Sequence, residues 1–169
     1  DNAVTSWAET IARVGKHQWP TRVTKTNAAL VDALSEAYGL DIDPFDVEQI
    51  QKLMGPVAKL IGTTFMNSAQ PTMLDAGYKV NVIPASASAQ VDGRVLPGYE
   101  KEFDETIAGL LGPNVRREDL ISDIALETDL SGPLVDAMAA AISAEDPKAK
   151  CVPYVLSGGT DAKAFARLG

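Results

Sequence analysis

Two polar side chains near the middle of the chain have the chemistry to hold a carboxylate. Arg94 carries a planar guanidinium fork that binds a carboxylate through two parallel hydrogen bonds, and Asn81 adds a neutral donor and acceptor. The spacing alone favours a plainer outcome, an ion pair between Arg94 and a neighbour such as Asp92. The sequence therefore predicts either a carboxylate-binding pair or an ordinary surface ion pair.

A second candidate site is the Gly-rich turn formed by Ser157, Gly158, Gly159 and Thr160. Adjacent glycines let backbone N–H groups approach a ligand closely, and a helix that follows leaves unpaired N–H donors at its start. Such a turn suits an anionic group or a developing oxyanion. Two glycines before a helix more often form only a tight turn, and the Lys of a phosphate-binding loop is absent.

His17 and Cys151 are each the only residue of their type in the chain. No Asp, Glu or Cys cluster lies near His17, so we expect a plain surface histidine, and a site that needs two histidines cannot be complete here. A lone cysteine forms no internal disulfide. We therefore expect a reducing compartment and a cytoplasmic protein.

Composition and charge exclude several classes of partner. The 169 residues are 46% apolar and 22% charged, which is typical of a soluble globular protein. A net charge of -8 disfavours nucleic acid or an anionic membrane surface as partner, because both attract Lys and Arg patches. The same charge disfavours an RNA-binding sheet. No apolar run approaches the roughly 18 residues that span a bilayer.

The elements that would position Arg94 are best defined around residues 85–95. Small or apolar side chains occupy the odd positions and polar ones the even positions, which predicts a strand with one buried and one polar face. Arg94 lies on the polar face, just before a Leu-Pro-Gly turn. Upstream, residues 79–84 form a second extended run that Pro84 ends.

The remaining patterns predict an α+β domain with a small, mainly antiparallel sheet. Helices are expected at residues 1–14, 26–38, 44–54 and 99–111, and further strands at 63–66, 72–74 and 120–126. Beyond Asp129 the pattern changes to a helix from Pro133, a strand at 151–156 and a helix at 162–168. We therefore predict a domain boundary near residue 128, between a domain at 1–128 and a partial α/β segment at 129–169.

Several motifs, taken together and in order, resemble a known family. These are the Asn-Val-Ile-Pro run at 81–84, the strand at 90–94, the turn at 96–98 and the Ser-Gly-Gly-Thr-Asp-Ala run at 157–162. The set resembles the zinc-dependent aminoacylase, carboxypeptidase and desuccinylase family of metallopeptidases. The first four residues also resemble the start of the first helix in that family's lid domain.

The resemblance implies a two-domain enzyme. An α/β catalytic domain would hold two zinc ions, and a ferredoxin-like lid domain with a four-stranded antiparallel sheet and helices on one face would form a homodimer. Such enzymes hydrolyse amide bonds of N-acyl amino acids or small peptides that carry a free carboxylate. A metal-bound water attacks and a Glu takes its proton.

Carried onto this chain, the resemblance assigns residues 1–128 to the lid, with its first strand missing and a helical insert at about 19–62. Residues 129–169 would return into the catalytic domain. Asn81 and Arg94 match the lid residues that hold the substrate carboxylate. Ser157, Gly158, Gly159 and Thr160 match the catalytic-domain loop that lines the substrate site.

The family's zinc-binding residues have no counterpart here. Its His-x-Asp motif, bridging Asp, Glu-Glu pair and late His are absent, and the lid histidine would lie before Asp1. We therefore expect a fragment that has no catalytic residue, binds no catalytic zinc and is inactive alone. The alternative is a non-catalytic homodimerising α+β module without a small-molecule ligand. Loss of acyl amino acid binding on Arg94→Ala would separate the two, and the substrate itself stays open.

Overall fold

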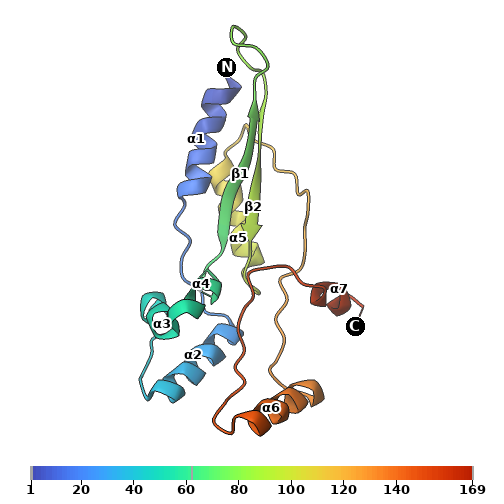
Figure 1. Ribbon diagram of the computed structural model, residues 1–169. Coiled ribbons are helices and arrows are strands. Elements are labelled where there is room, and N and C mark those ends of the chain that lie inside the picture. Colours follow the sequence, from blue (N-terminus) through green and yellow to red (C-terminus); the bar gives the residue numbers. More distant parts are fainter. Residues whose placement is uncertain (1, 62, 169) are drawn as a thin grey trace. The chain divides into compact units, whose positions relative to one another are not determined.

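The structure, a computed structural model, describes residues 2–61 and 63–168, and it is α+β (Figure 1). Its strands are β1 (Ser68–Ala76) and β2 (Ala87–Arg94). Its helices are α1 (Ala3–Lys16), α2 (Lys25–Tyr38), α3 (Val47–Met54), the 3₁₀ turn η1 (Gly55–Val57), α4 (Ala58–Ile61), α5 (Glu100–Leu111), α6 (Pro133–Glu145) and α7 (Ala162–Ala166). None of the helices in the described ranges is long and apolar enough to span a membrane.

The chain divides into two compact units. The ribbon unit contains residues up to 20 and residues 66–125, and the helical unit contains residues 21–65 and the chain from 126 onwards. The first segment of the helical unit, residues 21–65, falls close to the predicted insert at 19–62. The assignment of a lid and a catalytic segment to residues 1–128 and 129–169 stays a prediction.

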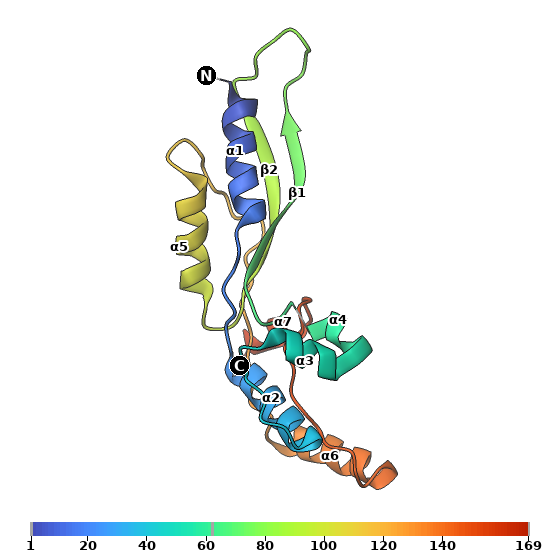
Figure 2. The same cartoon turned by 90° about the vertical axis from the view of Figure 1, so that its left-hand side faces the viewer.

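The ribbon unit is built on an antiparallel pair of strands. The register runs from Ser68 opposite Arg94 to Ala76 opposite Ala87, with a bulge at Thr72 between Pro71 and Met73. Helices α1 and α5 lie on the same side of this ribbon (Figure 2). The strand predicted at residues 85–95 is therefore confirmed as β2.

A small apolar core holds the two helices on the ribbon. Val14 of α1, Ala69 of β1 and Phe103 and Ile107 of α5 are all less than 10% exposed and contact one another. The indole ring of Trp19 stacks on Phe103, with ring centroids 5.1 Å apart and planes 13° apart. Gly93 of β2 lies against the Phe103 ring, so the odd-numbered face of β2 is its helix-facing side, as the alternation predicts.

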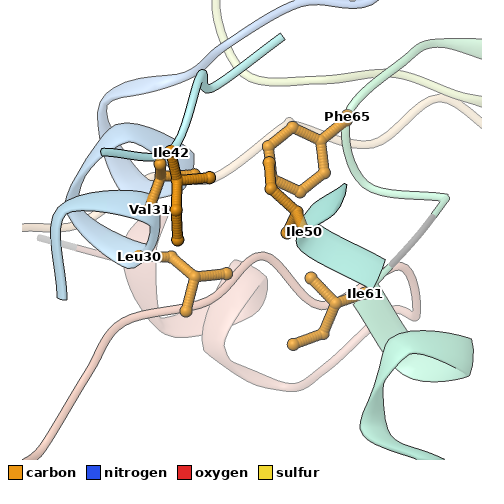
Figure 3. Close-up of a cluster of buried hydrophobic side chains, with 6 residues drawn as sticks. All are labelled: Leu30, Val31, Ile42, Ile50, Ile61 and Phe65. Atoms are coloured by element: carbon orange, nitrogen blue, oxygen red, sulfur yellow. The ribbon is translucent and has the colours of Figure 1, made fainter. Parts of the chain in front are cut away.

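The helical unit has a separate core, drawn in Figure 3. It consists of Leu30, Val31, Ile42, Ile50, Ile61 and Phe65. Asn27 is fully buried beside it and donates from Nδ2 to the carbonyl of Thr64 at 2.7 Å. Thr24 caps α2 by accepting from the N–H of Asn27 at 3.1 Å.

Charged contacts attach the later part of the chain to α2 within the helical unit. The Glu127 carboxylate accepts from the N–H of Thr26, Asp129 pairs with Lys25, and Lys150 pairs with Glu36. The hydrogen bond and charge of Asp129 raise the pKa of Lys25. None of the described residues from 126 to 168 is buried.

The predicted four-stranded sheet is not seen, because the sheet of the described residues has only two strands. Residues 63–66 form a turn in which the N–H and hydroxyl of Thr64 both donate to the carbonyl of Ile61. Residues 79–83 lie in the hairpin loop, where the N–H of Val82 donates to the carbonyl of Lys79.

The segments 120–126 and 151–156 also form no strand, although their sequences favour extended backbone. An extended segment becomes a strand only where a neighbour supplies its ladder of hydrogen bonds. Neither segment has such a neighbour, so the sheet of the described residues stays at two strands.

The contact between β2 and α5 gives a test of this packing. A Cβ on Gly93 would lie 2.9 Å from Cζ of Phe103, whereas a Cβ on Gly109 of α5 meets nothing within 4 Å. Gly93→Ala should therefore lower the free energy of unfolding by about 1–3 kcal/mol. Gly109→Ala should raise it by about 0.5–1 kcal/mol, because alanine favours the helix. Urea unfolding of both variants measures these changes. Equal changes in the free energy of unfolding would contradict the close contact between Gly93 and Phe103.

Candidate functional site

Arg94 ends β2 and lies opposite Ser68 at the open end of the ribbon, away from the hairpin loop. Its Nε lies 2.8 Å from Oδ2 of Asp92, which is the ion pair that the spacing favours. The Arg94 side chain is 52% exposed and the Asp92 side chain 47%. Ion pairs this exposed contribute about 0–1 kcal/mol to stability.

Asn67 fixes the turn that follows Arg94. Its side chain is buried, its Oδ1 accepts from the N–H of Leu96 at 2.8 Å, and its Nδ2 donates to the carbonyl of Tyr99 at 3.4 Å. The N–H of Tyr99 in turn donates to the carbonyl of Leu96 at 3.0 Å. This residue was not among the candidates, because one Asn beside a short strand carries no signal of burial in the sequence.

Asn81 lies in the hairpin loop at the opposite end of the ribbon, and its side chain is exposed. The loop covers residues 77–86, and the N–H of Ala3 at the start of α1 donates to its Pro84 carbonyl at 3.2 Å. Figure 1 shows this loop beyond the ends of β1 and β2. The sequence placed Asn81 in an extended run, and the structure places it in the turn.

Asn81 and Arg94 therefore do not lie together within one protomer. The length of β2, from Ala87 to Arg94, is seven residue steps. At about 3.3 Å a step, they separate the loop from Arg94 by about 23 Å. One carboxylate cannot contact both side chains of a single chain in this conformation. Whether either residue contacts a substrate stays a prediction.

The predicted loop of Ser157, Gly158, Gly159 and Thr160 belongs to the helical unit, between α6 and α7. All four residues are exposed. Added Cβ atoms on Gly158 and Gly159 would meet nothing within 4 Å, so packing does not require glycine at either position. Their predicted contact with a ligand stays a prediction.

The described residues contain no group of three or more His, Cys, Asp or Glu side chains able to hold a metal ion. His17 is half-buried, and its ring meets that of Trp19 edge-on at a centroid distance of 4.8 Å. The contact between the rings of His17 and Trp19 was not predicted from the sequence. An aromatic two residues away is the signal in the sequence that could have indicated this contact.

Comparison with known families now defines the class. The model of the peptidase dimerisation domain, M20_dimer, matches residues 1–118, which include both strands, α1 and α5. The chain therefore belongs to the M20 family of metallopeptidases, and the resemblance drawn from its motifs is confirmed.

One solved structure is similar over almost the whole chain. It is the M20 family metallo-carboxypeptidase Sso-CP2 from Sulfolobus solfataricus, at a TM-score of 0.55 and 15% sequence identity. The alignment covers 98% of this chain and 48% of that one, so the chain spans about half the length of that relative. At this identity the likeness shows the fold. No curated protein sequence matches the chain.

The hydrogen bonds by which Asn67 holds the turn after β2 can be tested by measuring the free energy of unfolding. Asn67→Ala leaves the buried N–H of Leu96 without its partner and should lower the free energy of unfolding by about 1–3 kcal/mol. The same substitution at the exposed Asn81 is the control and should change it by less than about 0.5 kcal/mol. Chemical denaturation measures the free energy of unfolding of both variants. Comparable decreases would mean that the Asn67 side chain does not stabilise the turn.

Proposed function

We propose that this chain is the lid and dimerisation part of a larger zinc-dependent hydrolase that cleaves amide bonds in N-acyl amino acids or small peptides with a free carboxylate. The observation that carries the proposal is that the dimerisation-domain match covers the ribbon on which Arg94 is exposed. The two zinc ions of the enzyme would be held by residues outside this chain, where they would polarise the amide carbonyl.

Arg94 is proposed to bind the substrate carboxylate. The turn after β2 is fixed by the buried Asn67, so the backbone at Arg94 is held while its side chain stays half exposed. A guanidinium positioned in this way can exchange Asp92 for a ligand carboxylate. Separately, the loop of Ser157, Gly158, Gly159 and Thr160 is proposed to contact the substrate of the larger enzyme.

Asn81 is proposed to serve the site of the partner protomer. Its separation of about 23 Å from Arg94 along β2 prevents both residues of one chain from holding one carboxylate. In a homodimer with antiparallel ribbons, the hairpin loop of one protomer lies beside the Arg94 end of the other. Two composite sites would then form, each with Arg94 from one chain and Asn81 from its partner.

The second candidate function is a homodimerising module that binds no small molecule. The ion pair between Arg94 and Asp92 favours it, since it already gives the guanidinium a carboxylate partner. The two functions differ in one observable. Binding of an N-acyl amino acid that is lost on Arg94→Ala supports the hydrolase, and no binding supports the module.

A mixed-dimer experiment tests the composite site in the full-length protein. Arg94→Ala and Asn81→Ala should each reduce kcat/KM by about 30-fold or more, because each removes one contact to a desolvated carboxylate. Coexpression of the two variants should restore about one quarter of wild-type activity. About half of the dimers are then mixed, and in each mixed dimer one of the two sites regains both residues. No recovery would contradict the exchange between protomers.

Zinc content tests the location of the metal ligands. A zinc site needs three or four protein ligands. The chain has a single histidine and a single cysteine, and its described residues include no group of three or more His, Cys, Asp or Glu side chains able to hold a metal ion. The purified 169-residue chain should therefore retain no stoichiometric zinc after incubation with excess Zn²⁺ and desalting, and should not hydrolyse N-acyl amino acids. Nearly two zinc ions per chain, about the full family complement, would contradict the proposal.

A further inference from the structure

Asp92 and Arg94 occupy successive positions on the polar face of β2. Side chains two residues apart on a strand point to the same face, and Gly93 between them lies on the helix-facing side. The register places Gln70 opposite Asp92 and Ser68 opposite Arg94, and neither of these cross-strand partners carries a charge. Asp92 is therefore the carboxylate that the ribbon itself presents to Arg94.

The contact between them is a charge-assisted hydrogen bond from Nε of Arg94 to Oδ2 of Asp92 at 2.8 Å. The ladder with β1 holds the strand before Arg94, and Asn67 holds the turn after it, so the backbone sets the spacing of the two side chains. Each side chain stays about half exposed. Exposed ion pairs add little to folding stability, so the main consequence of this contact is that Asp92 offsets the positive charge of Arg94.

We infer that Asp92 sets the affinity of Arg94 for the substrate carboxylate by acting as a competing carboxylate within the chain. The inference rests on the proposed role of Arg94 and adds a residue that lowers its affinity for anions. A substrate carboxylate must replace the contact with Asp92, and it meets the negative charge of Asp92 as it approaches. Both costs fall on an anionic ligand, and neither falls on a neutral one.

A positioning role for Asp92 is the alternative, and it predicts a change of the opposite sign. If Asp92 held the guanidinium in place for the substrate, loss of its carboxylate would weaken substrate binding. A competing carboxylate predicts tighter binding once its charge is removed. The sign of the change in KM on Asp92→Asn therefore separates the two roles.

Steady-state kinetics of the full-length protein provides the test. The probes are the N-acetyl forms of the standard L-amino acids and the amide of the best substrate among them, in which a neutral carboxamide replaces the carboxylate. Asp92→Asn should lower KM for that acid by about 3–10-fold and leave kcat within about 2-fold. For the amide, KM should change by less than about 2-fold, because a neutral group does not compete with Asp92 for the guanidinium.

Two further variants control for general effects of charge. Glu105 of α5 forms an exposed ion pair with Lys101 at 3.7 Å, so Glu105→Gln removes the same charge and a similar pair away from β2. It should leave KM within about 2-fold, since exposed charges that do not contact the ligand are largely screened by salt. In an Arg94→Ala background, Asp92→Asn should change KM by less than about 2-fold, because the contact is already lost.

The outcomes separate this inference from the proposed function. Suppose that Arg94→Ala reduces kcat/KM by about 30-fold or more, but Asp92→Asn leaves KM for the acid unchanged or raises it. The competing role of Asp92 is then overturned while the proposed function stands, and an equal fall in KM for acid and amide has the same meaning. No hydrolysis of any N-acetyl amino acid by the wild type, or no loss on Arg94→Ala, overturns the proposed role of Arg94 and this inference with it.

Discussion

A two-stranded ribbon is marginally stable alone in water, and β1 and β2 depend on the two helices that cover one of their faces. The contact that allows this cover is the approach of Phe103 to Gly93, where no Cβ separates helix from strand. Val14 and Ala69 complete the same small core. Because the helices occupy one face only, the Arg94 side chain at the end of the ribbon is 52% exposed.

Much of this architecture follows from the sequence, because its signals are local. Helices α1, α2 and α5 begin and end within about two residues of their predicted bounds, and α6 begins at the predicted Pro133, since apolar spacing and glycine or proline stops act over a few residues. The alternation at residues 85–95 predicts β2 and its helix-facing side. The order of the motifs also identifies the family, although each motif alone is loose.

The rest depends on contacts that a single sequence does not carry. Residues 120–126 have strand-forming composition but no neighbouring strand, so the predicted sheet of four strands is wrong for the described residues. The bulge at Thr72 and the burial of Asn67 arise from tertiary packing. The motifs predicted that Asn81 and Arg94 hold the same carboxylate. The hairpin geometry, which the sequence does not reveal, places them at opposite ends of the ribbon.

The distance between positions 81 and 94 decides whether Asn81 and Arg94 meet within one protomer or only between two protomers. Spin labels on Asn81→Cys and Arg94→Cys, in a Cys151→Ser background, allow two samples to be compared. Doubly labelled chains diluted with unlabelled protein report the distance within a protomer, and a mixture of singly labelled chains reports the distance between protomers. The account predicts about 23 Å or more within a protomer and a shorter distance between protomers. A short distance within one protomer and none between protomers would contradict it.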